Sequence, residues 1–130
     1  PSRYVAAQQW RSLVSNTADE ALNRCDFLAT PAVAANVKPI GEDEIVIAGR
    51  RVFYRPPLSR YSALVNQTGL PAISLPLNRD GVPPPSIQFI GRRWGEHRLL
   101  ELGSLLEREG VSRCRRPAGG NMFPNVHLPA

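Results

Sequence analysis

The apolar residues of this chain recur with helical spacing in three stretches. In the longest, from Tyr4 to Arg24, they follow one face for about five turns, while most polar residues fall on the other side. A shorter stretch covers residues 61–68, and a third begins at Glu96 and ends at Gly110. An acid in the first turn and a glycine just past the last one are typical of helix ends. The pattern therefore predicts three amphipathic helices.

Short apolar runs bounded by proline, glycine or polar residues predict strands. Single runs occupy residues 26–30, 72–75 and 87–90. Between Glu44 and Tyr54, two β-rich runs flank Ala48-Gly49, which predicts a hairpin with a two-residue turn. The runs at 72–75 and 87–90 are apolar at nearly every position, so we expect them inside a larger sheet that is covered on both faces.

The resulting order is helix, strand, hairpin, helix, strand, strand, helix. It predicts an α/β protein, namely the C-terminal portion of a mixed β-sheet flanked by helices. We expect residues 1–110 to be incomplete as a domain, because their central strands would leave an open sheet edge. The start at Pro1 rather than Met is a further indication of a fragment or a processed chain. Residues 111–130 show no period and are expected to form an extended or disordered tail.

Several local contacts are expected from short-range patterns. Ser2 is a candidate N-cap of the first helix, and Ser59 can cap the short helix that follows it. Trp94 and Leu99 have the spacing of a hydrophobic staple across the start of the last helix. Thr30 lies at the end of the first strand, where we expect its hydroxyl to bind local backbone.

An ordered set of motifs runs through the second half of the chain. It consists of Asn66, Gly69-Leu-Pro-Ala-Ile-Ser74, Pro76, Asp80-Gly81, Gln88 to Arg92 and Glu96. At this spacing the set resembles the amidase signature hydrolases, and an Asp followed by two apolar residues and Thr-Pro at residues 26–31 extends the resemblance over most of the chain. The resemblance implies an amidase-signature-like fold in an enzyme that hydrolyses carboxamide C–N bonds.

The catalytic machinery of that family is absent from this sequence. The family uses a serine in a Gly/Ser-rich loop, a second bridging serine and a neutral lysine. Here there is no Ser-Ser pair, and the sole lysine, Lys38, lies in a polar loop that would not desolvate it. The resemblance places the machinery upstream. We therefore assign no catalytic residue, expect the chain to be inactive alone, and expect its partner to be the N-terminal catalytic part of the same amidase.

The resemblance also implies that this segment completes the sheet and lines part of the acyl pocket. Glutamine-hydrolysing tRNA amidotransferase subunits carry, two residues before an aromatic residue, an acid that holds the α-amino group of the substrate. The matching positions here are Ser59 and Tyr61. Serine in place of the acid favours a general carboxamide or aryl/acyl amidase. Ser59 and Tyr61 are the candidate substrate-binding residues, and the amide substrate is expected only in the complete enzyme.

Charge and composition change this picture little. The formal charge of +5 comes from 16 basic and 11 acidic residues, and all the basic residues except Lys38 are arginines. The arginines are scattered and lack interleaved aromatic residues, which disfavours nucleic acid as a partner. The alternative function is a stand-alone interaction module, with nucleic acid, bound through these arginines, as one candidate partner. An upstream reading frame with a Gly/Ser-rich loop and a lysine would decide for the amidase.

Cofactor and location follow from the remaining residue types. His97, His127, Cys25 and Cys114 do not have metal-ligand spacing, so we expect no metal and no other cofactor. Two cysteines far apart in the sequence are typical of a reduced, cytoplasmic protein. No stretch approaches the roughly 18 apolar residues of a membrane span, and no membrane association is expected.

Overall fold

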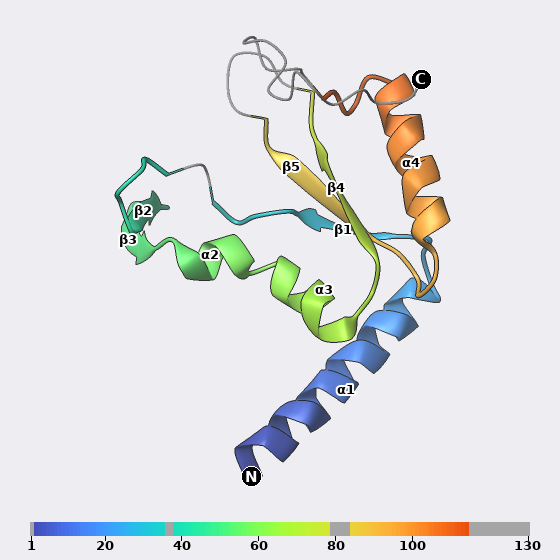
Figure 1. Ribbon diagram of the computed structural model, residues 1–130, viewed down its shortest axis with the longest axis horizontal. Helices are drawn as coiled ribbons and strands as arrows, with labels where there is room; N and C mark the ends of the chain where they lie inside the picture. Colours follow the sequence, from blue (N-terminus) through green and yellow to red (C-terminus); the bar gives the residue numbers. More distant parts are fainter. Residues whose placement is uncertain (1, 36–37, 79–83, 115–130) are drawn as a thin grey trace, which may run out of the picture.

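The computed structural model describes residues 2–35, 38–78 and 84–114. In chain order its elements are α1 (Ser2–Leu22), β1 (Leu28–Pro31), β2 (Glu44–Ile47), β3 (Arg50–Phe53), α2 (Arg55–Ser59), α3 (Ser62–Thr68), β4 (Ala72–Pro76), β5 (Ser86–Ile90) and α4 (Glu96–Arg108). Helices lie on both sides of a small sheet, with α4 alongside β4 and with α2 and α3 running from the sheet towards a separate hairpin (Figure 1). The predicted α/β class is confirmed.

The main sheet has three strands in the order β1-β5-β4, and β2 and β3 form the separate hairpin. Every strand pair among the described residues is antiparallel. The predicted hairpin turn is confirmed, since Ala48 has φ 48° and Gly49 has φ 78°. Two successive positive φ values are the signature of a type I′ turn, whose twist matches that of the paired strands.

A small apolar core joins the C-terminal half of α1 to the sheet. Ala18 and Leu22 of α1 pack with Leu70 and Ile90, and Val65 of α3 packs against this group. On the other face of the sheet, α4 approaches β4 through Gly103. The sheet is therefore covered on both faces, but each face is covered by little more than one helix.

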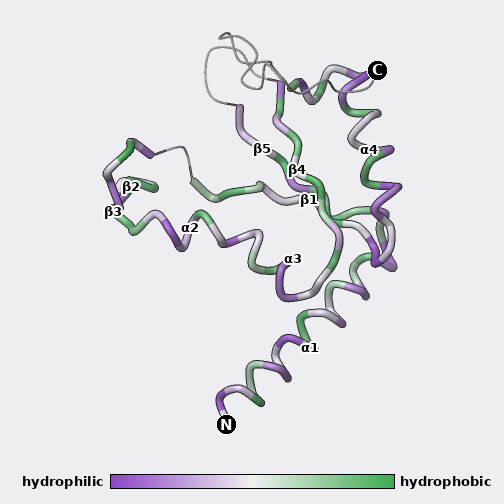
Figure 2. The backbone as a smooth tube through the Cα atoms, in the orientation of Figure 1, coloured by the Kyte–Doolittle hydropathy of each residue, from purple (hydrophilic) through white to green (hydrophobic). Residues whose placement is uncertain are grey.

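The N-terminal half of α1 projects away from the rest of the molecule (Figure 1). Its helical pattern is confirmed, yet only Ala18 and Leu22 are buried, and Trp10 is 67% exposed. Apolar positions occur along α1 out to its N-terminal turns (Figure 2). The neighbouring helix α3 reaches only as far as Arg11, whose Nε donates to the carbonyl of Gln67 at 2.7 Å. Beyond that contact, no described residue is close enough to bury the apolar side chains of α1.

The expected serine caps are not formed. Ser2 is the first residue of α1 rather than the residue before it. Ser59 is the last residue of α2, a helix that the sequence pattern did not predict, and its hydroxyl donates to the carbonyl of Arg55 at 3.2 Å. The residue that precedes α3 is Tyr61, which makes no capping hydrogen bond. The missed helix begins at Arg55 and continues with Pro56 and Pro57, which fit a first helical turn because no N–H is needed there.

The expected staple between Trp94 and Leu99 is also wrong. Trp94 is 88% exposed and has φ 60°, whereas Leu99 is 3% exposed and packs close to Gly91. The left-handed backbone at Trp94 makes a tight turn between β5 and α4, which leaves the indole in solvent. Leu99 instead faces the end of β5.

Arginines hold this turn against the end of α1. Arg92 donates through Nε to the carbonyl of Leu22 at 2.9 Å, which satisfies a free carbonyl at the helix end. Arg93 pairs with Asp19 at 3.4 Å, and Arg98 pairs with Asp26 at 3.0 Å. These arginines act within the fold.

Replacing Gly69 with valine should destabilise the protein by roughly 1–2 kcal/mol, the cost of a left-handed conformation for a residue with a Cβ. Gly69 has φ 67°, and its N–H donates to the carbonyl of Val65 at the end of α3. A Cβ at Gly69 would meet only Arg93 Nη1, at 3.9 Å, so backbone strain dominates. Gly69→Asn is the matched control, because asparagine tolerates this conformation. Equal melting temperatures for the valine and asparagine variants would contradict the prediction.

Candidate functional site

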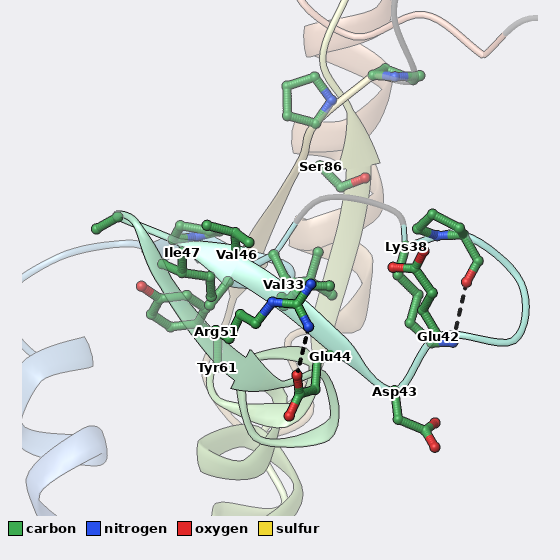
Figure 3. A pocket seen from close by; sticks show the side chains of 18 residues that line it. Val33, Lys38, Glu42, Asp43, Glu44, Val46, Ile47, Arg51, Tyr61 and Ser86 are labelled. Carbon is green, nitrogen blue, oxygen red and sulfur yellow. Dashed lines mark hydrogen bonds and ion pairs between the residues drawn. The ribbon is translucent and has the colours of Figure 1, made fainter.

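A broad open cleft lies between the hairpin, the segment that follows β1 and the start of β5 (Figure 3). Its volume is about 1560 Å³. The lining residues include Val33, Lys38, Glu42, Asp43, Glu44, Val46, Ile47, Arg51, Tyr61 and Ser86. Apolar side chains from β2 and from residues 31–35 therefore share one cavity with a group of charged side chains.

The charged groups of the cleft lie on the hairpin and on the loop before it. Glu44 and Arg51 form an ion pair of 3.5 Å across the two strands. Arg51 is largely exposed and Glu44 partly exposed, so the pair adds about 0–1 kcal/mol to stability. Lys38 Nζ donates to the carbonyl of Pro39 at 3.4 Å and lies 5.7 Å from the ring centroid of Tyr54. Within the described residues, Lys38 contacts no serine hydroxyl that it could deprotonate.

The two candidate substrate-binding residues, Ser59 and Tyr61, lie in different parts of the structure. Tyr61 is half-buried and lines the cleft, immediately before α3. It lies one turn before Val65, which packs on the core and so holds this end of the helix in position. Ser59 is exposed, is not among the lining residues, and uses its hydroxyl within α2. The structure thus brings Tyr61, but not Ser59, to the cavity.

Sequence reasoning missed most of the cleft wall. Glu44, Val46 and Arg51 come from the hairpin, and Ser86 comes from the start of a strand about 40 residues away. The strand pattern identified the hairpin itself. No local pattern indicates that the hairpin lies opposite the start of β5, because that placement depends on the tertiary fold.

Thr30 differs from its expected structural role. Its Oγ1 is buried and has no hydrogen-bond partner among the described residues, so the expected bond to local backbone is wrong. The register places Thr30 opposite Gln88, and Gln88 opposite Ser74. These side chains form a polar row across one face of the sheet, in which Gln88 is only 5% exposed.

The described residues include no group of three or more His, Cys, Asp or Glu side chains that could hold a metal ion. His97 is exposed on α4, and His127 lies outside the described residues. Cys25 donates its thiol hydrogen to the carbonyl of Ala21 at 3.3 Å. None of the helices in the described part of the chain is both long and apolar enough to cross a bilayer.

Comparison with known proteins identifies the family. The family model described as Amidase matches residues 1–100. The chain belongs to the amidase family. It is 32% identical over 117 residues to a fatty acid amide hydrolase of Oryza sativa subsp. indica, covering 88% of this chain and 19% of that protein. It is 31% identical over 116 residues to one of the subunits of the glutamyl-tRNA(Gln) amidotransferase of Dechloromonas aromatica, covering 89% of this chain and 23% of that protein.

Solved structures share the arrangement of elements. One comes from "an unexpected vestigial protein complex" that "reveals the evolutionary origins of an s-triazine catabolic enzyme". It matches with a TM-score of 0.78 at 25% identity, over 89% of this chain and 26% of that chain. A "crystal structure of amidase" matches with a TM-score of 0.74 at 24% identity. The chain thus spans about a fifth of the length of its curated relatives and about a quarter of the solved chains.

Proposed function

We propose that this chain is the C-terminal, pocket-lining part of an amidase that hydrolyses carboxamide C–N bonds. The observation that carries the proposal is the family match over residues 1–100, combined with coverage of only 19% of a relative of similar sequence. In this proposal, residues 1–110 complete the amidase domain and residues 111–130 follow as a tail. Tyr61 contacts the acyl part of the substrate, and Ser59 occupies the position at which glutamine-reading relatives carry an acid.

The chemistry of the described side chains supports a segment without its own catalytic centre. The hydroxyls of Ser12, Ser59 and Ser62 each donate to a backbone carbonyl three or four residues earlier. The single lysine, Lys38, bonds the neighbouring backbone. A serine nucleophile needs a base within hydrogen-bond reach, and no described serine has Lys38 as that base.

The partner in this proposal is the N-terminal catalytic part of the same amidase. We propose no cofactor, no membrane and no nucleic acid as further partners, and a cytoplasmic location. Several arginines that the alternative reading would assign to nucleic acid are engaged within the fold, including Arg92, Arg93 and Arg98. That engagement favours the amidase over a nucleic-acid-binding module.

The 130-residue chain alone should release no ammonia from simple carboxamides such as benzamide. The reason is that the Ser-Ser-Lys machinery has to come from the catalytic part. The measurement is ammonia release by the purified chain, compared with the same chain co-purified with the catalytic part of the amidase. Turnover by the isolated chain that persists in Lys38→Ala would contradict the proposal, because it would require a nucleophile and a base within these residues.

A further inference from the structure

Gln88, in the central strand β5, carries a buried side-chain amide. The residue is only 5% exposed, yet its side chain forms no hydrogen bond with any described residue. A glutamine amide can donate twice and accept twice, and leaving it unpaired in a protein interior is costly. Because buried polar groups in folded proteins are nearly always paired, this amide indicates a partner outside the described residues.

The residues beside Gln88 in the sheet are also polar. Thr30 lies opposite it on β1, and Ser74 lies opposite it on β4. The hydroxyl oxygen of Thr30 is buried and has no partner among the described residues, whereas Ser74 is exposed. The polar row is therefore closed at β1 and open at β4, so a further group can reach Gln88 from the side of Ser74.

The polar row lies between the apolar core and the cleft. Side chains alternate along a strand, so Ser86, Gln88 and Ile90 share one face of β5. Ile90 packs with α1 in the core, and Ser86 lines the cleft. Gln88 is thus at the boundary where the part of this face that α1 covers ends and the wall of the cleft begins.

We infer that Gln88 is a positioning residue for amide hydrolysis: its side-chain amide binds the backbone of the loop that carries the serine nucleophile, and Thr30 holds that amide in one orientation. The inference rests on the proposed function, in which the nucleophile comes from the catalytic part and has to lie beside the cleft. A glutamine amide suits this role because it can donate to a backbone carbonyl and accept from a backbone N–H at the same time. Since Gln88 is buried, it acts through the loop and does not touch the substrate.

The test uses the 130-residue chain co-expressed with the catalytic part of the amidase and assayed on simple carboxamides from acetamide to benzamide. Gln88→Met keeps an unbranched side chain of similar size and removes the amide. We expect kcat to fall by about 10- to 100-fold with KM unchanged within about threefold, because a displacement of about 1 Å at the reacting groups can cost this much. Gln67→Met, the same change at an exposed position of α3, is the matched control and should leave kcat unchanged within about twofold.

A second variant decides the test if Gln88→Met does not assemble with the catalytic part. Thr30→Val replaces the buried hydroxyl with a methyl group of similar size. We expect kcat to fall by about three- to tenfold, the effect of losing one hydrogen bond. Because Thr30 acts through Gln88, the double variant should have a kcat within about twofold of Gln88→Met alone. A kcat equal to that of the wild type in Thr30→Val would overturn the inference.

The possible outcomes separate the inference from the proposed function. If the wild-type complex hydrolyses none of the carboxamides, the proposed function fails, and the inference with it. If the wild-type complex is active and Gln88→Met has the same kcat, only the inference fails. If Gln88→Met lowers the melting temperature of the complex and leaves kcat unchanged, the amide of Gln88 has a structural role alone, and the inference is overturned.

Discussion

The 130-residue chain expressed alone should aggregate, self-associate or bind a hydrophobic dye strongly, and it should become soluble in a 1:1 complex with the catalytic part of the amidase. The buried apolar residues of the described chain are few, namely Ala18, Leu22, Leu70, Leu75, Ile90 and Leu99. Many larger side chains remain in water, including Tyr4, Trp10, Phe53 and Trp94, which are 67–88% exposed. The chain as described thus exposes more large apolar side chains than it buries.

The magnitudes decide the expected outcome. Each large apolar side chain left in water forfeits roughly 1.5–3 kcal/mol of burial. A whole domain has only about 5–15 kcal/mol of net stability. Covering Trp10 on α1 and Phe53 on the hairpin would by itself recover a large part of that range. On the proposed function, we therefore expect the catalytic part to stabilise the fold of this chain as well as to supply the chemistry.

The measurement is sedimentation of the isolated chain together with a thermal melt, followed by the same experiments on the co-expressed complex. The control is Trp10→Gln, which removes one exposed apolar side chain from α1 without touching the core. It should reduce dye binding by the isolated chain and weaken the complex. A monodisperse monomer with a sharp cooperative transition would contradict the prediction and would favour the stand-alone interaction module.

The elements that sequence analysis located correctly are those whose cause is local. Gly69 and Gly110 end helices with positive φ, and the hairpin turn has two such residues in succession. Each of these features is visible within a few positions of sequence. The helix α2 was not predicted, although the pair Pro56-Pro57 fits the first turn of a helix.

Features whose cause is tertiary could not be predicted. Trp94 lies at the staple position by spacing, but the turn that holds it is docked through Arg92 on the end of α1, 70 residues earlier. Prediction of the candidate site from the sequence was limited in the same way. Tyr61 was identified through the resemblance to the amidase family, whereas Ser86 and Arg51 enter the cleft only through the placement of β5 against the hairpin.

Replacing Gly103 with leucine should destabilise the complete enzyme by about 2–3 kcal/mol and should be among the most damaging single changes in α4. At Gly103 the helix lies directly on β4: a Cβ there would be 3.1 Å from Cδ1 of Ile73 and 3.7 Å from Cδ2 of Leu75. A leucine adds four carbons where one barely fits. Overpacking a filled contact costs about 1–3 kcal/mol and occasionally more.

Helix propensity favours the replacement of Gly103 and so opposes the steric cost. Glycine inside a helix is less favourable than leucine by a little under about 1 kcal/mol, so any substitution gains that amount before steric effects are counted. Gly103→Ala should therefore be close to neutral, because its single added carbon offsets the gain. Gly103→Leu should be strongly unfavourable, because α4 has to move away from β4 to make room.

Ser104→Leu is the matched control, since the next residue is exposed on α4 and gains helix propensity without meeting the sheet. It should leave stability unchanged within about 0.5 kcal/mol. The measurement is the melting temperature of the co-expressed complex for all three variants. We expect a clear fall only for Gly103→Leu. A Gly103→Leu complex that melts with the wild type would show that α4 does not pack on β4 through this glycine.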